Sequence, residues 1–168
     1  MTISVNADGL SIRYGTSQGT VNVIGSPRQS GAYKTIVVDF GYQDLDAYTV
    51  SNSFFGGTPD VFIPAGSSIV SATLYVTTAF DSGSTATLGL GLVKYDGTEI
   101  DYDGIDVAIA ETALDTIGKV VNCDGALIAG SGGAVLTTFD AYPSYDVGTA
   151  SYTVGQARLE IKYFHPVA

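Results

Sequence analysis

Six carboxylates are concentrated in residues 99–118, "EIDYDGIDVAIAETALDTIG", within a chain that otherwise holds few charged side chains. Carboxylates at alternate positions around an Asp-Gly turn are the ligands that an EF-hand loop offers to Ca²⁺. Aligning Gly104 with the glycine of that loop places Glu99, Asp101 and Asp103 at the first three ligand positions. The bidentate closing position then falls on Ala110, which has no side-chain oxygen, so the spacing does not match an EF-hand.

An irregular calcium site is the alternative for the same stretch. Its candidate ligands are Asp101, Asp103 and Asp106, completed by a distant loop. Neighbouring turn carboxylates alone bind a cation weakly, so we expect no bound metal and little effect of a chelator on thermal stability.

Helix formation explains the stretch better. Asp106 stands at the N-cap position of "VAIAETALDTI", where its carboxylate can accept a hydrogen bond from the first turn. Apolar residues recur at four-residue spacing through Ile105, Ile109, Ala113 and Ile117. Gly118 follows as a left-handed C-cap. The sequence therefore predicts one short helix over residues 106–117.

Other catalytic patterns are weak. The one histidine, His165, precedes Pro166 near the end of the sequence, a position typical of a structural or solvated side chain. Nothing selects a carboxylate pair for glycoside hydrolysis, and no glycine-rich phosphate loop or zinc spacing occurs. Trp is absent, so only tyrosines such as Tyr142 and Tyr145 could stack on a sugar. We expect neither an enzyme nor a bound cofactor, and no small-molecule substrate.

Composition limits the classes of partner. The 168 residues suit one main domain, and a net charge of −10 argues against nucleic acid, whose phosphates require Lys and Arg. Residues 61–80 are uncharged, yet Pro64, Gly66 and many hydroxyl groups favour two strands and a turn over a membrane span. The start of the sequence shows no signal peptide, and we expect no membrane partner. The lone Cys123 is expected to be a small buried hydrophobe.

Alternation of apolar and polar residues dominates the rest of the chain. Residues 67–77 place Val70, Ala72, Leu74 and Val76 on one side, and residues 84–95 place Ala86, Leu88, Leu90 and Leu92 on one side, with "DSGS" as a turn between them. The two segments are expected to form a hairpin. Further strand candidates are residues 34–41, 47–52, 60–65, 119–129, 134–139, 150–155 and 157–164.

Two segments of this β pattern suggest more detail. The outward Gly89 and Gly91 indicate that another backbone or a partner packs closely over that face. Residues 151–161 are expected to form a closing hairpin that buries Leu159, Ile161 and, just beyond it, Tyr163. About eight to ten short strands with one helix predict an all-β fold, an antiparallel β-sandwich of jelly-roll type.

The first 33 residues differ in texture. They are rich in Gly, Ser, Thr and Gln, with few bulky apolar side chains, and cannot bury much by themselves. We expect an extended N-terminal arm or loosely held strand pair over residues 1–33, followed by a β-sandwich domain over residues 34–168.

Residues 63–130, from "IPAGSSIVSATLYVTTAFDSG" through "DGTEIDYDGIDVAIAETALD" to "ALIAG", together with the hairpin at 150–164, resemble a group of small tailed-phage virion proteins. The resemblance implies a β-sandwich on the outer surface of the capsid, a decoration or cement protein made in the host cytoplasm. Such proteins commonly form homotrimers, bind the major capsid protein and clamp neighbouring capsomers with arms.

Two other functions stay open at this point. One is a head-fibre or tail receptor-binding β module that contacts host glycans through surface tyrosines. The other is a carbohydrate-active enzyme domain. The copy number per particle separates the first from a cement protein, and sugar release or glycan binding would support the second.

Overall fold

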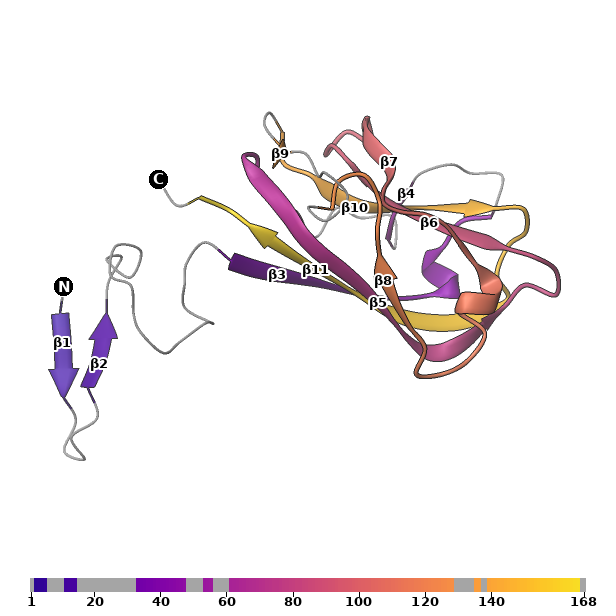
Figure 1. The fold of residues 1–168 in the computed structure, drawn as a ribbon, viewed down its shortest axis with the longest axis horizontal. Helices are drawn as coiled ribbons and strands as arrows, with labels where there is room; N and C mark the ends of the chain where they lie inside the picture. The colour runs from indigo at the N-terminus through magenta and orange to yellow at the C-terminus, as the bar shows by residue number, and fades with distance from the viewer. Residues whose placement is uncertain are drawn as a thin grey trace.

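The computed structural model describes residues 2–5, 11–14, 33–47, 53–55, 61–128, 135–136 and 139–166, and these residues are almost all in strands and turns (Figure 1). The strands are β1 (Thr2–Val5), β2 (Ser11–Tyr14), β3 (Tyr33–Gly41), β4 (Ser53–Phe54), β5 (Ser67–Asp81), β6 (Thr87–Val93), β7 (Glu99–Ala110), β8 (Val120–Cys123), β9 (Val135–Leu136), β10 (Tyr142–Gly148) and β11 (Val154–Phe164). Two short 3₁₀ turns, η2 (Tyr42–Asp44) and η4 (Glu111–Ala113), interrupt them.

Two antiparallel sheets form the body of the molecule. One sheet has the order β4-β10-β6-β7 and the other β3-β11-β5-β8, with β9 pairing the start of β5. Setting β9 aside and counting the remaining eight body strands in chain order, the sheets read 2-7-4-5 and 1-8-3-6. This is the strand order of a jelly roll, so the predicted antiparallel β-sandwich is confirmed.

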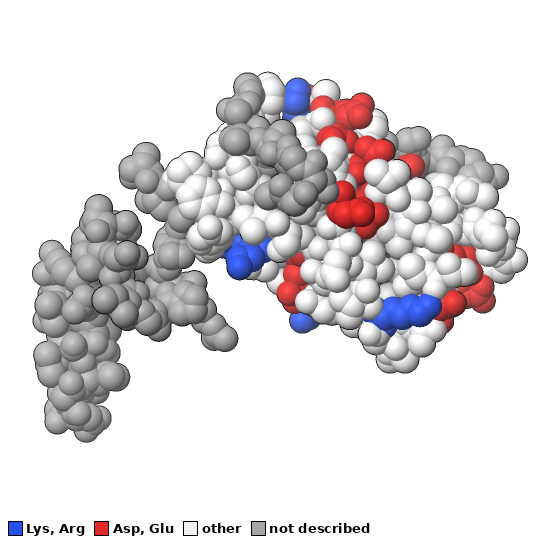
Figure 2. Space-filling view, viewed as in Figure 1, with Lys and Arg blue, Asp and Glu red and all other residues white. Residues whose placement is uncertain are grey.

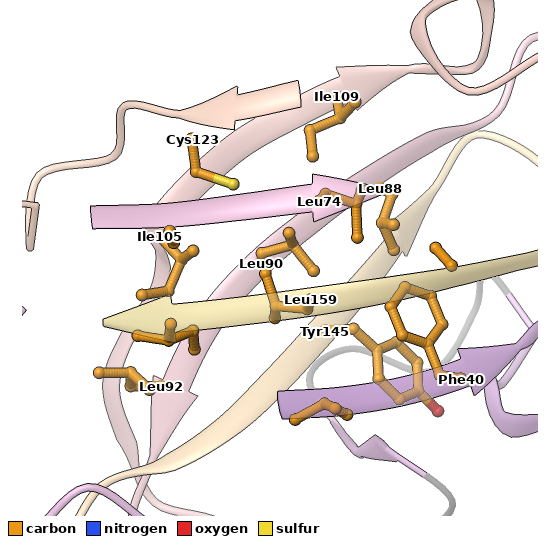
Figure 3. Close-up of a cluster of buried hydrophobic side chains, with 14 of the residues drawn as sticks. Phe40, Leu74, Leu88, Leu90, Leu92, Ile105, Ile109, Cys123, Tyr145 and Leu159 are labelled. Atoms are coloured by element: carbon orange, nitrogen blue, oxygen red, sulfur yellow. The ribbon is translucent and has the colours of Figure 1, made fainter. Parts of the chain in front are cut away.

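The core lies between the two sheets (Figure 3). Alternation along β5 and β6 buries Ala72, Leu74, Val76, Ala86, Leu88, Leu90 and Leu92, as predicted. Val70 is only half-buried, because the register between β5 and β11 shifts there and Ile69 takes the inward position. The inward residues predicted on the last strand, Leu159, Ile161 and Tyr163, are buried as well.

The predicted hairpins are wrong in their pairing. β5 and β6 belong to different sheets, and residues 82–86 carry the chain across the core instead of turning it back on itself. In the same way residues 149–153 lead from β10 in one sheet to β11 in the other. Alternation shows which side chains face inward, but two strands that face each other across a core have the same pattern as two neighbours in one sheet.

The predicted helix over residues 106–117 is also wrong. Residues up to Ala110 continue β7, and only the single turn η4 follows. Ile105 and Ile109 are buried, yet a four-residue spacing is also an even spacing, which puts both side chains on one face of a strand. Ile117, the last residue of the expected apolar stripe, is 70% exposed.

The expected helix caps therefore have other roles. Asp106 lies within β7 opposite Leu90 of β6. Gly118 has the expected positive φ, 84°, but in the turn that leads to β8, where its N–H donates to the carbonyl of Val76 at 2.9 Å.

The outward glycines of β6 are explained by the path of β7. A Cβ on Gly91 would lie 2.1 Å from the carbonyl oxygen of Tyr102, whereas a Cβ on Gly89 would meet its nearest neighbour at 3.5 Å. The register between β6 and β7 shifts three times, and Leu90 and Leu92 pair with Asp106 and Asp101. The extra residues of β7 pass over the outer face of β6, which is the close backbone approach that the glycines predicted.

Most of the expected N-terminal arm lies outside the described residues. Within it, β1 and β2 pair with each other in antiparallel register and form a separate two-stranded sheet. The strand expected at residues 47–52 also lies outside the described part, apart from Ala47.

Candidate interaction surfaces

The six carboxylates of residues 99–118 do not converge on one point. Glu111 accepts hydrogen bonds from the Ser82 hydroxyl and, at 3.2 Å, from the Ala86 N–H, and so holds the crossover between the sheets. Asp115 pairs with Lys119 at 2.6 Å. Among the described residues, no three His, Cys, Asp or Glu side chains are placed to hold a metal ion.

Asp101 and Asp103 are the two metal candidates that do lie together. Burial raises the pKa of Asp101 above its ordinary value, and the hydrogen bond to Asp103 and the charge of Glu99 raise it further. Mutual repulsion of this kind is relieved by a proton or by a positive charge from outside.

Asp106 is separated from this pair. Its side chain is 7% exposed and shares a hydrogen bond with the thiol of Cys123, the one cysteine. Burial, together with the charge of Asp124, raises the pKa of Asp106. Burial also raises the pKa of Cys123 to about 12, so the thiol stays protonated and behaves as the small buried side chain that the sequence predicts.

A groove of about 310 Å³ opens beside β7 on the outer face of the first sheet. Its lining consists of Thr87, Gly89, Glu99, Tyr102, Asp103, Val107, Ala108 and Asp146. Acidic side chains gather over the region of β7 in Figure 2. The groove therefore has an acidic lining with an apolar part, which suits a positively charged group and repels phosphate.

His165 has a structural role. Its Nδ1 lies 3.0 Å from the hydroxyl of Ser67, and Ser67 is fully buried. The contact ties the end of β11 to the start of β5. A buried hydroxyl cannot reach a substrate, so this Ser-His pair does not form a nucleophilic site.

Tyr142 and Tyr145 do not form the pair that could stack on a sugar. Three residues apart on β10, they point to opposite faces. Tyr145 is 1% exposed in the core, where its hydroxyl accepts a hydrogen bond from the N–H of Asp46 at 2.8 Å.

Tyr142 instead belongs to a surface aromatic row. Its ring centroid lies 5.8 Å from that of Phe62 and 5.8 Å from that of Tyr95. Tyr95 is 71% exposed and Phe62 is 45% exposed. Beside the row, the ammonium of Lys94 lies 4.1 Å from the ring centroid of Phe139. We call Phe62, Tyr95 and Tyr142 the aromatic row.

Sequence reasoning did not find this row, because its members come from three separate segments. Phe62 precedes the isolated bridge between Ile63 and Ala141, and Tyr95 lies in the turn between β6 and β7. The one local signal is a bulky aromatic side chain next to turn residues, as in "KYDGT". Aromatic side chains gathered in one exposed patch are typical of binding surfaces.

The outer face of the second sheet is a different surface. Arg158 of β11 grips Asp39 of β3 through two hydrogen bonds, at 2.7 and 3.0 Å, and this contact lowers the pKa of Asp39. Tyr75 of β5 lies opposite Arg158, and Val120 of β8 lies opposite Tyr75; both side chains are exposed.

In the part of the chain that the structure describes, no helix is long and apolar enough to cross a membrane.

Comparisons with known proteins give matches to solved structures. No protein-family model matches the chain, and no curated protein matches it. The fold is similar to a chain in the capsid of Ralstonia phage GP4, with 12% identity and a TM-score of 0.50 over 90% of this chain and 96% of that chain. Chains in the cyanophage Pam1 capsid asymmetric unit and in the acidic stable capsid of Helicobacter pylori bacteriophage KHP30 match with 14% and 16% identity and TM-scores of 0.49 and 0.48. They cover 91% and 80% of this chain and 98% and 94% of their own lengths.

The Ralstonia phage match covers 90% of this chain and 96% of that chain, so the two have similar lengths and a similar fold over most of them. The resemblance to phage virion proteins that the sequence indicates is thus matched at the level of the fold.

Proposed function

We propose that this chain is a structural protein of a phage virion, a capsid decoration or cement protein. It binds the outer surface of the assembled shell and bridges neighbouring capsomers. The observation that carries the proposal is the likeness of its fold, over 90% of the chain, to a chain of similar length in a phage capsid. The sequence resemblance over residues 63–130 supports it independently.

The surface chemistry suits such a role. Charged residues make up only 14% of the chain, and most of the exposed large apolar side chains lie in the aromatic row or on the outer face of the second sheet. Weak contacts of this kind, repeated over several shell subunits, add up as multivalent binding and resist pressure from inside. The proposed partner is the major capsid protein, with the chain acting as a homotrimer.

The aromatic row is the contact that we assign to the shell. Tyrosines dominate binding energy when a partner covers them, and Tyr95 is the most exposed large apolar side chain among those described. The assay uses phage particles that lack this chain, to which purified chain is added. We expect Tyr95→Ala to bind these particles about tenfold or more weakly than wild type, in line with loss of an interface tyrosine.

Ile117→Ala is the matched control, because Ile117 is equally exposed, at 70%, but lies outside the row. The readout is occupancy of the added chain on the particles, measured by sedimentation and gel densitometry. Equal occupancy of the two variants would show that the aromatic row does not contact the shell. Cryo-electron microscopy of the parent particle tests the function itself, and density for this chain only on the tail would overturn it.

A head-fibre or tail receptor-binding module is the second candidate, and the aromatic row is what favours it. Exposed rings in a row can stack on sugars, and jelly rolls also occur in lectins. Copy number separates the two functions, because a cement protein approaches the number of shell subunits and a fibre or tail protein is present in few copies.

A further inference from the structure

The edges of the two sheets are not alike. In the first sheet the edge strand β4 has two residues and the edge strand β7 shifts register against its neighbour three times. In the second sheet β8 has four residues and β9 has two. Short or bulged edges are the usual protection against pairing with another chain. Three of the four edges are therefore closed in this way.

The fourth edge, β3, has no such protection. It pairs with β11 over nine consecutive residues without a shift, and within the described residues it has no other strand partner. It contains no proline, and its centre, "TIVV", is a run of β-branched residues that favour strands. Its charged residues are Lys34, at its start, and Asp39, whose carboxylate is paired with Arg158 of β11. A long, regular, open edge is a template for a further strand.

The chain also holds strands that need a sheet. β1 and β2 pair over only four residues each and form a sheet of their own. A two-stranded unit of this size is marginal in water and gains stability when a third strand or a larger sheet adds to it.

Charge favours contact between these two parts. Residues 1–32 contain Arg13, Arg28 and one acid, Asp8, which gives a net charge of +1. Residues 33–168 contain five bases and sixteen acids, which gives −11. The N-terminal segment and the body are thus complementary in sign, and two bodies repel each other unless something joins them.

We propose that the open edge of β3 receives the β1–β2 pair from a second copy of this chain, which extends the β3-β11-β5-β8 sheet across the subunit boundary. Among the described residues of one chain, the pair forms its own sheet and β3 has no strand partner besides β11. The 18 residues between β2 and β3 can span at most about 60 Å, enough to reach a neighbouring copy. Such exchange is head-to-tail, and it closes when the copies form a ring. This inference does not rest on the proposed function.

Paramagnetic relaxation between differently labelled chains tests the contact directly. A Thr2→Cys chain is labelled with a nitroxide at position 2, since the buried Cys123 does not react with the label. This chain is mixed with a wild-type chain that is ¹⁵N-labelled and carries no nitroxide. Broadening of the amides of residues 33–41 in the ¹⁵N chain is the expected result. Broadening at β7, at β8 or nowhere would overturn the proposal.

Proline substitution tests whether strand pairing is the cause. Ile12→Pro lies within β2 and removes a strand hydrogen bond, whereas Gln18→Pro lies between β2 and β3 and is the control. We expect Ile12→Pro to be monomeric by light scattering. The β3 amides that point away from β11 should exchange their hydrogens at least tenfold faster than in wild type. Gln18→Pro should behave as wild type.

Thermal melting of both variants should keep one cooperative transition of the body, whose described core includes neither position. Gln18→Pro should melt as wild type, and Ile12→Pro should melt at a lower temperature, because it loses the stabilisation that association gives. A wild-type chain that is monomeric at high concentration contradicts the proposal, whether or not β3 is protected. So does an Ile12→Pro variant that still associates. Because purified chain is used without particles, failure here leaves the shell-binding role untouched.

Discussion

At the scale of single residues, Gly91 shows how a missing side chain can carry structural information. Its neighbour on the strand face, Gly89, looks identical in the sequence "LGLGL". Only Gly91 lies under the backbone of Asp101 and Tyr102, with no room for a Cβ. The sequence predicted a close approach over this face correctly, but it could not say which of the two glycines requires it.

This difference gives a stability prediction. Gly91→Ala should lower the free energy of unfolding by about 2–3 kcal/mol, in the range of overpacked sites, because the clash is with backbone that cannot swing away. Gly89→Ala should leave stability unchanged or raise it slightly, since alanine suits a strand better than glycine.

Urea unfolding of the two variants measures the difference. If Gly91→Ala were as stable as Gly89→Ala, the path of β7 over β6 would have to be different from the one described.

At the scale of elements, β7 is where prediction from sequence was least successful. Its isoleucines have a spacing compatible with a helix and with a strand, and Asp106 looks like an N-cap. What decides in favour of the strand is pairing with β6, because Ile109 lies opposite Leu88 and both are buried. Such partners are distant in the sequence, so local patterns do not reveal them.

The buried carboxyl of β7 predicts a pH dependence. Because the pKa of Asp106 is raised in the folded state, its contribution to stability is present at low pH and is lost as the pH rises through that pKa. Asp106→Asn should therefore raise the melting temperature at pH 7 by about 2–4 °C, with no gain near pH 3.

Asp115→Asn is the control with the opposite sign. The hydrogen bond from Lys119 lowers the pKa of Asp115, so its small, solvent-screened contribution is present at neutral pH and lost in acid. Scanning calorimetry of both variants from pH 3 to pH 8 measures these trends. A melting temperature of Asp106→Asn below that of wild type at pH 7 would contradict the assigned burial.

At the scale of the whole molecule, the sequence allowed the fold class to be predicted but not the pairing of strands. Short alternating strands indicated a jelly roll, and most of the inward residues were identified correctly. Candidate sites fared worse, because Tyr142 finds its aromatic neighbours Phe62 and Tyr95 only through the fold. Surfaces of this kind are assembled from separate segments, and a single sequence contains no record of their proximity.

Interleaving of the sheets predicts cooperative unfolding. The chain passes repeatedly from one sheet to the other, for example from β5 to β6 and from β10 to β11, so neither sheet consists of one continuous segment. Neither can detach while the other stays folded. We expect the body to unfold in one transition.

Coincident far-UV and near-UV circular dichroism melts, with equal calorimetric and van't Hoff enthalpies, are the measurement. Two resolved transitions from the body would contradict this expectation.

The pairing of β3 with β11 makes the response to force depend on direction. The N-terminal segment joins the body at Tyr33, whose partner is Phe164, the last residue of β11. Tension between these two points unzips the strands, so that the nine residue pairs open one after another. Tension on the N-terminal segment directed along β3, against a body held at its far side, loads all nine pairs at once in shear. A protein anchored by that segment therefore holds best when it is pulled along its strands, and peels most easily when it is lifted by both ends.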